Sequence, residues 1–213
     1  AEIDALLADE MVPGRPRAAL MKLALLFHDL GKPGTRAVRP DGQVTFIGHD
    51  QLSVQLMEPY LEDLKLSTRE IGYINLLVGQ HLRPGFLDLA APSLPKMLHR
   101  YFVDLGDWGV DLALISIADR LGAQGPKITP AHNERHWAIV ERIVRAYWRE
   151  TALVVRPPDL LNGSDLLTAL GIDPGPQVGV LLRMIKEAQV EGTVATKDEA
   201  LAFAAEFLKG VEA

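Results

Sequence analysis

The residues with the clearest capacity for chemistry are His28 and Asp29, an adjacent pair at the end of the apolar segment 23–27 and just before Gly31 and Lys32. Burying an unpaired imidazole and an unpaired carboxylate in such a segment costs several kcal/mol. A divalent cation bound to both side chains offsets that cost. It also removes the unfavourable placement of an acid at the negative end of a helix. The pair therefore predicts a metal site.

Three more residues have ligand character and lie where helices are expected to start or stop. They are His49 in Gly48-His49-Asp50, His81, and Asp119 in Ala118-Asp119-Arg120. Cysteine is absent, so imidazole and carboxylate are the only strong ligands, and these suit Mn, Fe, Co, Ni, Zn or Mg. Five ligands exceed the need of one tetrahedral zinc ion. We expect one or two divalent metal ions, with Asp29 as the bridge and a metal-bound hydroxide that attacks phosphorus.

Cations follow two of these residues directly. Lys32 comes after the His-Asp pair and Arg120 after Asp119, and an ammonium and a guanidinium are the groups that bind phosphate oxygens. We therefore assign catalytic roles to Asp29, Lys32 and Arg120. Both side chains could equally be surface charges without a catalytic role.

Each candidate ligand has a plainer alternative. His28 could be a hydrogen-bonded core histidine, and His49 could lie on the polar face of a helix. His81 could interact with a helix dipole, and Asp119 could form a buried ion pair. The other three histidines, His99, His132 and His136, lack such a context and are predicted not to bind metal.

The elements that must position these side chains are almost all helices. Apolar residues recur at the helical period in 17–30, 50–64, 68–81, 94–104, 108–122, 132–152, 164–170, 176–191 and 197–209. Gly and Pro separate these segments, as at Gly125-Pro126, and a short extended piece is expected at 43–47. The prediction is an all-α fold. Pro157-Pro158 divides it into residues 1–156 and a small helical subdomain, 157–213.

Composition limits the classes of function. Of 213 residues, 48% are hydrophobic and 23% are charged. The net charge of −6 argues against nucleic-acid binding by the surface as a whole. A local basic face remains, because His132, Arg135, Arg142, Arg145 and Arg149 recur on one side of a helix. It is either a solvated surface or a contact for nucleic acid.

The chain carries no membrane or secretion signal that we recognise. There is no apolar segment of about 18 residues, and the first residues contain acids where a signal peptide is basic and then apolar. A cytoplasmic location is expected. The opening lacks Met and resembles the middle of an amphipathic helix, which suggests a piece of a longer chain.

Taken in order, the motifs of residues 17–122 resemble the HD superfamily of metal-dependent phosphohydrolases. They are His28-Asp29 with Gly31-Lys32, Gly48-His49-Asp50 with Ser53, His81, and Ala118-Asp119-Arg120. The resemblance implies an HD-domain helical bundle with His28, Asp29 and Asp119 at the core metal positions. It also implies that His49 and His81 correspond to the extra histidines of binuclear members. The superfamily usually has another His about one helix upstream, and none precedes His28.

The C-terminal part resembles the tail of bacterial CCA-adding tRNA nucleotidyltransferases and poly(A) polymerase-like proteins. The residues that carry this resemblance lie in 161–167, 170–179 and 191–200. Two functions are therefore expected. The first is hydrolysis of phosphomonoesters or of 2′,3′-cyclic and other nucleotide phosphodiesters. The second is a non-catalytic structural or tRNA-contacting module with a vestigial HD site.

Overall fold

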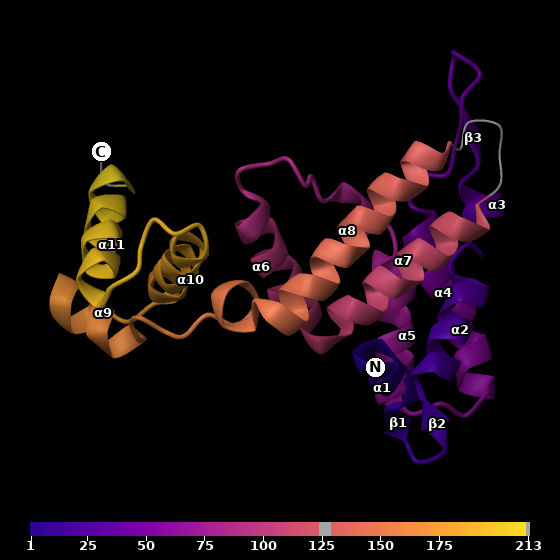
Figure 1. The fold of residues 1–213 in the computed structure, drawn as a ribbon, viewed down its shortest axis with the longest axis horizontal. Coiled ribbons are helices and arrows are strands. Elements are labelled where there is room, and N and C mark those ends of the chain that lie inside the picture. Colours follow the sequence, from indigo (N-terminus) through magenta and orange to yellow (C-terminus); the bar gives the residue numbers. More distant parts are fainter. Residues whose placement is uncertain (124–128, 212–213) are drawn as a thin grey trace. The chain divides into compact units, whose positions relative to one another are not determined.

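Helices joined by short turns make up the protein. The computed structural model describes residues 1–123 and 129–211 (Figure 1). The helices are α1 (Glu2–Ala8), α2 (Arg17–Phe27), α3 (Lys32–Thr35), α4 (His49–Asp63), α5 (Thr68–Gln80), α6 (Leu94–Leu105), α7 (Gly109–Gly122), α8 (Pro130–Arg149), α9 (Gly163–Leu170), α10 (Pro176–Val190) and α11 (Lys197–Val211). Short helical turns are η1 (Arg83–Phe86), η2 (Gly106–Trp108) and η3 (Thr151–Val155). The prediction of an all-α fold is confirmed. The break expected at Gly125-Pro126 lies outside the described residues.

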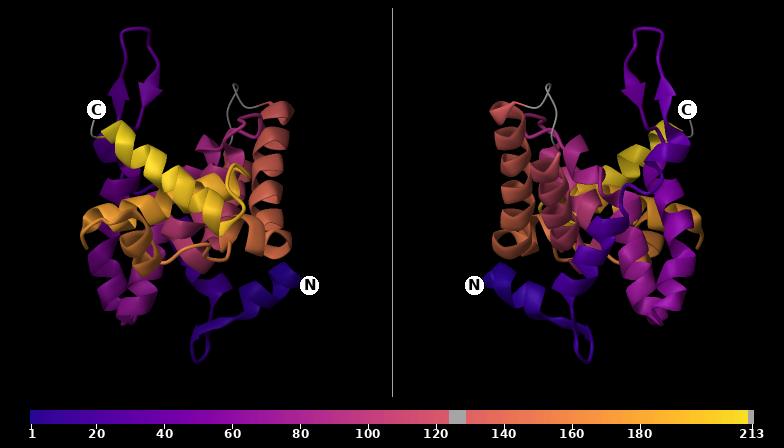
Figure 2. Two further views of the ribbon diagram at one scale, coloured as in Figure 1. Left: turned by 90° about the vertical axis from the view of Figure 1, so that its left-hand side faces the viewer. Right: turned by 90° about the vertical axis from the view of Figure 1, so that its right-hand side faces the viewer.

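Two small hairpins accompany the helices. Strands β1 (Glu10–Val12) and β2 (Arg15–Pro16) pair antiparallel, as do β3 (Ala37–Val38) and β4 (Val44–Thr45). Strand β4 lies within the extended piece expected at 43–47, and Figure 2 shows the β3–β4 hairpin extending away from the nearby helices. The β1–β2 hairpin was not predicted, because strands of two or three residues are too short to show an alternating pattern.

Local side-chain chemistry explains several helix boundaries. Ser67 accepts a hydrogen bond from the Glu70 N–H while the Glu70 carboxylate accepts one from the Ser67 N–H, which caps α5. Asn162 and Asp165 cap α9 in the same way. The helix expected to extend to residue 152 ends at Arg149, because Glu150 leaves the helical region with a φ of −125°.

The described chain divides into two compact units that interleave along the sequence. The first contains residues 1–86 and 108–141, and the second contains 87–107 and 142–213. The core of the first unit includes Met57, Tyr73 and Leu77, all fully buried. In the second unit, a separate cluster is centred on the buried Leu166 and Leu181. The division into 1–156 and 157–213 stays a prediction.

A buried polar network fixes three helices of the first unit against one another. Arg17 at the start of α2 contacts the carboxylate of Asp111 on α7 at 2.8 Å, and the Tyr73 hydroxyl on α5 donates to the same carboxylate at 2.9 Å. Burial raises the pKa of Asp111 to about 6, against the opposing influence of Arg17. The network matters for function because α2, α5 and α7 end near His28, His81 and Asp119.

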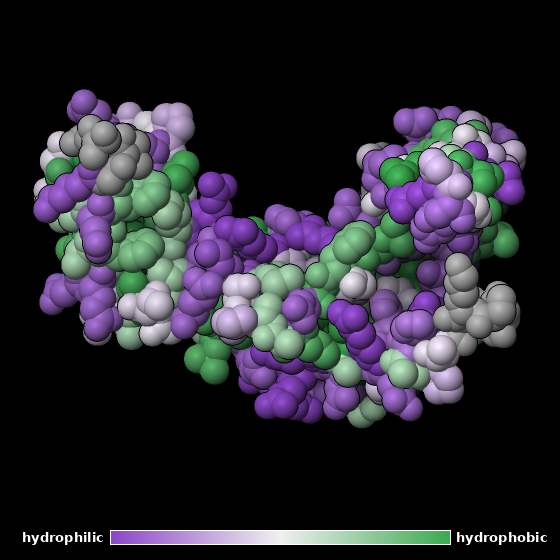
Figure 3. Space-filling view, turned by 90° about the horizontal axis from the view of Figure 1, so that it is seen from above, coloured by the Kyte–Doolittle hydropathy of each residue, from purple (hydrophilic) through white to green (hydrophobic). Residues whose placement is uncertain are grey.

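The surface carries both polar and apolar side chains, as the mixed composition predicts. On the face drawn in Figure 3, hydrophilic and hydrophobic residues are intermixed. Within the part of the chain that the structure describes, no helix has both the length and the apolar character needed to cross a membrane.

Candidate metal centre

Four helix ends bring the five predicted ligands together in the first unit. His28 is the C-terminal cap of α2 and His81 that of α5, while His49 is the first residue of α4. Asp119 lies in the last turn of α7, and Asp29 follows His28. Gly48 precedes His49 with a φ of 81°, a conformation that glycine adopts without strain, and it turns the chain into α4.

The three histidines share one hydrogen-bonding arrangement. In each, Nδ1 lies 2.7 Å from the backbone oxygen three residues earlier, which is Leu25 for His28, Phe46 for His49 and Val78 for His81. A carbonyl oxygen only accepts, so Nδ1 carries the proton. Each neutral ring therefore presents the lone pair of Nε2. This arrangement fixes the tautomer that a metal ligand needs.

The Nε2 atoms of these rings and the carboxylate oxygens converge. His28 Nε2 lies 3.1 Å from Asp119 Oδ1 and 3.2 Å from Asp29 Oδ2. His49 Nε2 lies 3.3 Å from Asp29 Oδ1 and 3.3 Å from His81 Nε2. Two triads result, His28-His81-Asp119 and Asp29-His49-His81, and within each the ligand atoms lie within 4.8 Å of one another. They share His81, and Asp29 lies between His28 and His49.

The site is partly enclosed. His81 and His49 are 3% and 7% exposed, whereas the Asp29 and Asp119 side chains are each 33% exposed. The four helix ends thus place the imidazoles inside and leave the carboxylates accessible to a small ligand from solvent.

Electrostatic coupling among these groups is strong. Burial alone would lower the pKa of His28, but hydrogen bonds to Asp119 and Asp29 outweigh it and raise the pKa to about 10. Burial would raise the pKa of Asp29, yet His28 and Lys32 hold that pKa well below its usual range. The hydrogen bond from His28 also lowers the pKa of Asp119. The pKa of His81 is lowered by burial, and His28 and His49 add to the effect. Both carboxylates are thus ionised at neutral pH.

A buried serine fixes the turn that carries His28 and Asp29. Ser53 Oγ donates to the His28 carbonyl oxygen and accepts from the Gly31 N–H, both at 2.8 Å. Gly31 itself packs so tightly that an added Cβ would lie 2.2 Å from the His49 carbonyl oxygen. This contact explains why the sequence has Gly after the His-Asp pair, although the Gly31 φ of −75° is open to any residue.

The two cations assigned to phosphate have partners of their own. Lys32 Nζ lies 2.5 Å from Asp29 Oδ2, so a positive charge already balances this acid at the helix end. Arg120 Nε donates to Asn133 Oδ1 on α8 at 3.1 Å. Lys32 therefore borders the ligand cluster directly, and Arg120 is held toward α8.

The histidines predicted not to bind metal lie outside both triads. His136 on α8 is nevertheless close to the centre, since its Nε2 lies 3.0 Å from Ser116 Oγ, one helical turn before Asp119. Sequence reasoning missed this proximity. The spacing of His132 and His136 places both on one face of a helix. That spacing does not indicate which helix the face packs against.

The basic face of α8 is only partly available. Arg142 and Arg145 contact Glu150 at 2.8 and 3.3 Å, so one carboxylate balances part of their charge. Arg135 is exposed on the same helix. Glu150 lies one residue beyond the end of α8, so the spacing of the basic residues along the helix does not reveal it.

Comparisons with known proteins place the chain beside tRNA nucleotidyltransferases. Residues 131–205 match a family model described as tRNA nucleotidyltransferase domain 2. The A-adding tRNA nucleotidyltransferase of Deinococcus radiodurans is 33% identical over 196 residues, which cover 91% of this chain and 43% of that protein. The CC-adding tRNA nucleotidyltransferase of Thermus thermophilus is 34% identical over 200 residues, covering 93% and 42%. That of Synechocystis sp. is 26% identical over 190 residues, covering 89% and 41%.

The chain thus spans less than half the length of the curated relatives that it matches. The predicted resemblance of this chain to part of the CCA-adding tRNA nucleotidyltransferases is confirmed. The descriptions of these matches name nucleotide addition to tRNA, not hydrolysis of phosphoesters.

Proposed function

We propose that the first unit of this chain is a metal-dependent phosphohydrolase centre of the HD type, within a protein related to tRNA nucleotidyltransferases. The observation that supports it best is the convergence of three imidazole Nε2 atoms and two carboxylates at four helix ends. His49 Nε2 and His81 Nε2 face each other at 3.3 Å while both Nδ1 atoms are engaged with carbonyls. Two facing lone pairs repel each other unless a cation or a proton lies between them.

The donor set fits one or two divalent ions. Asp29 Oδ1 is buried and accepts no hydrogen bond among the described residues, although His49 lies 3.3 Å away. A buried carboxylate oxygen without a donor is costly, and a metal ion relieves that cost. The two Asp29 oxygens face different triads, which suits a bridging carboxylate. Imidazole and carboxylate ligands suit Mn, Fe, Co, Ni, Mg or Zn.

A divalent ion in this centre would supply Lewis-acid stabilisation of a phosphoryl oxygen and would lower the pKa of water. The chain's own residues do the rest. The carbonyls of Leu25, Phe46 and Val78 orient the imidazoles. Lys32 lies beside Asp29, where its ammonium can contact a phosphate oxygen. Arg120 follows Asp119 in the chain and is the second candidate, although its Nε is hydrogen-bonded to Asn133 on α8. The expected substrates are phosphomonoesters and 2′,3′-cyclic or other nucleotide phosphodiesters.

The second candidate function is a structural, tRNA-contacting module. It is supported by the names of the relatives and by the exposed Arg135 on α8. In this alternative the ligand cluster is a vestige that binds metal weakly or not at all. A cytoplasmic location is proposed for either function.

Metal analysis coupled to turnover separates the two functions. The purified protein would be assayed for bound metals, then for phosphatase and 2′,3′-cyclic nucleotide hydrolysis with Mn, Ni, Co and Mg added. Asp29→Asn removes a ligand charge, and Asp63→Asn, at the exposed end of α4, is the matched control. Metal-dependent turnover that is lost in Asp29→Asn and kept in Asp63→Asn supports the hydrolase.

The opposite result is also informative. Absence of metal and of turnover in the unchanged protein, together with tRNA affinity that Asp29→Asn leaves intact, would favour the structural module. The salt dependence of tRNA binding, compared with that of Arg135→Gln, then reports whether the α8 face contacts phosphates.

A further inference from the structure

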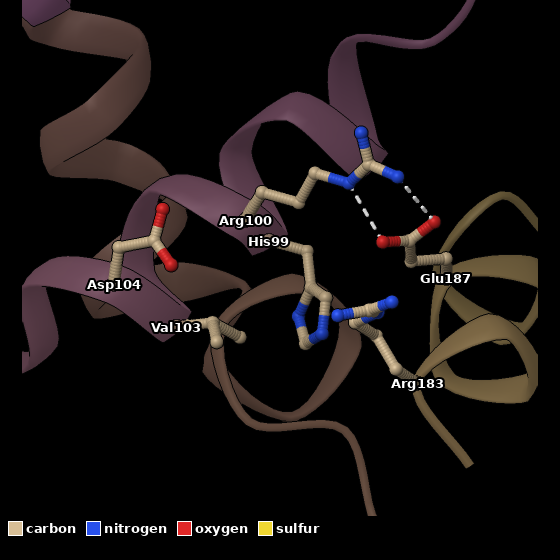
Figure 4. A pocket seen from close by; sticks show the side chains of 6 residues that line it. All are labelled: His99, Arg100, Val103, Asp104, Arg183 and Glu187. Carbon is tan, nitrogen blue, oxygen red and sulfur yellow. Dashed lines mark hydrogen bonds and ion pairs between the residues drawn. The ribbon is translucent and has the colours of Figure 1, made fainter. Parts of the chain in front are cut away.

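A cavity lined mostly by charged side chains lies in the second unit, bordered by helices that carry none of the proposed metal ligands. Helices α6 and α10 border a space of about 350 Å³, a size at the lower end of small-molecule sites. His99, Arg100, Val103, Asp104, Arg183 and Glu187 line it (Figure 4). Neither the proposed metal centre nor the α8 basic face uses any of these side chains.

The acid nearest the cations is already neutralised. Arg100 donates to both oxygens of Glu187, from Nε at 2.6 Å and from Nη2 at 2.7 Å, and Lys96 Nζ lies 3.4 Å from Glu187. These hydrogen bonds from Arg100 lower the pKa of Glu187, which stays ionised. The second acid, Asp104, lies apart, and Figure 4 shows Val103 and His99 between it and Arg183.

Arg183 is the cation that the surrounding structure leaves unmatched. Across the described residues, the structure pairs it with no carboxylate and gives its guanidinium no hydrogen bond. Figure 4 shows the side chain extending from α10 toward the imidazole of His99. Arg100 uses Nε and Nη2 on Glu187, which leaves Arg183 as the cation available to a ligand at this wall. A planar guanidinium with free N–H groups is suited to two oxygens of one phosphate.

His99 adds an acceptor at the base of the cavity. It is 6% exposed, and its Nδ1 donates to the Val154 carbonyl oxygen at 2.8 Å. In the neutral ring, Nε2 is then an acceptor, because only one of the two nitrogens carries a proton. Such a nitrogen can accept a hydrogen bond from a hydroxyl group. The cavity therefore offers donors for an anion and one buried acceptor for a hydroxyl.

We propose that this cavity binds the phosphate group of a ribonucleotide, with Arg183 on the phosphate oxygens and His99 Nε2 accepting from the ribose 2′-hydroxyl. The shared chemistry fits two sources, a free ribonucleotide and one residue of an RNA chain. The proposal is independent of the proposed hydrolase, since no metal ligand takes part.

The test is a binding titration of the whole protein in EDTA, which keeps the metal centre from capturing phosphate. The probes are inorganic phosphate, AMP, dAMP and a short RNA hairpin, titrated into the unchanged protein, Arg183→Gln and Lys209→Gln. Arg183 and Lys209 are both exposed, so neither change should disturb folding, and both remove one positive charge from the second unit. Lys209 lies outside the cavity and serves as the matched control.

We expect Arg183→Gln to weaken AMP or hairpin binding by about 10- to 100-fold, the effect of losing hydrogen bonds to a charged group. Lys209→Gln should stay within about twofold. Binding of AMP and phosphate points to a free ligand, and Arg183-dependent binding of the hairpin alone points to an RNA chain. No binding by any probe, or equal losses in the two variants, overturns the phosphate site. Equal affinity for AMP and dAMP overturns the role of His99. The titration is made in EDTA and the hydrolase is assayed only with added metal, so failure of this site and failure of the hydrolase are distinguished.

Discussion

Replacing Ser53 by Ala tests whether the turn between α2 and α3 is held in place for metal binding. The Ser53 hydroxyl makes two buried hydrogen bonds, one to the His28 carbonyl oxygen and one from the Gly31 N–H. Both groups flank Asp29. Ser53 itself is 0% exposed, so the variant leaves two main-chain groups without a partner in the interior.

The size of the effect follows from these two contacts. A buried polar group that loses its partner costs about 1–3 kcal/mol. The two groups together would cost about 2–6 kcal/mol if fully dry, and we expect about 2–3 kcal/mol because the neighbouring Asp29 side chain is 33% exposed and admits water. Loss of a group that orients metal ligands typically weakens metal affinity by about 10- to 100-fold.

Two measurements check this expectation. Urea denaturation gives the change in the free energy of unfolding, and calorimetric titration of metal-stripped protein with Mn²⁺ gives the change in affinity. Ser164→Ala is the control, since Ser164 is an exposed serine in the first turn of α9. Metal affinity within twofold of the unchanged protein, in a folded Ser53→Ala variant, would refute the argument that this hydroxyl positions the ligands.

Three further outcomes follow from packing and burial. Gly31→Ala should destabilise the fold by about 3 kcal/mol or more, because its Cβ would overlap the His49 carbonyl, whereas Gly72→Ala, which meets nothing within 4 Å, should be neutral or stabilising in the same urea assay. Asp111, whose folded pKa of about 6 exceeds its unfolded value, stabilises the fold below about pH 4 and loses that contribution as pH rises through 6. The unfolding free energy of the unchanged protein minus that of Asp111→Asn should therefore fall by about 3 kcal/mol from pH 4 to pH 7, and a rise would contradict the assignment. Leu166→Ala, at a fully buried position of the second unit, should cost about 2–5 kcal/mol by calorimetry, and a cost below 1 kcal/mol would show that this cluster is not a packed core.

The helices could be predicted because their apolar periods are long and their ends are marked locally. Ser67 with Glu70 and Asn162 with Asp165 are caps that four consecutive residues specify. The candidate ligands could be predicted for a related reason. A histidine or an acid at the end of an apolar helix is expensive without a partner, so its residue type and position already indicate one.

The arrangement within the centre depended on contacts that no local pattern contains. The sequence does not show that His81 belongs to both triads, or that Ser53, 22 residues after Gly31, holds the ligand turn. The same is true of the ion pair between Arg100 and Glu187, which lie 87 residues apart.

The helical class and the chemical types of the candidate ligands could be predicted from the residues alone, because the hydrophobic period and the side-chain chemistry are local properties. Three features depend on the folded chain: which ring nitrogens converge, the contact of Lys32 with Asp29, and the lack of an ion-pair partner for Arg183 among the described residues. These contacts depend on which helix ends lie together. The packing of whole helix faces against one another determines those positions.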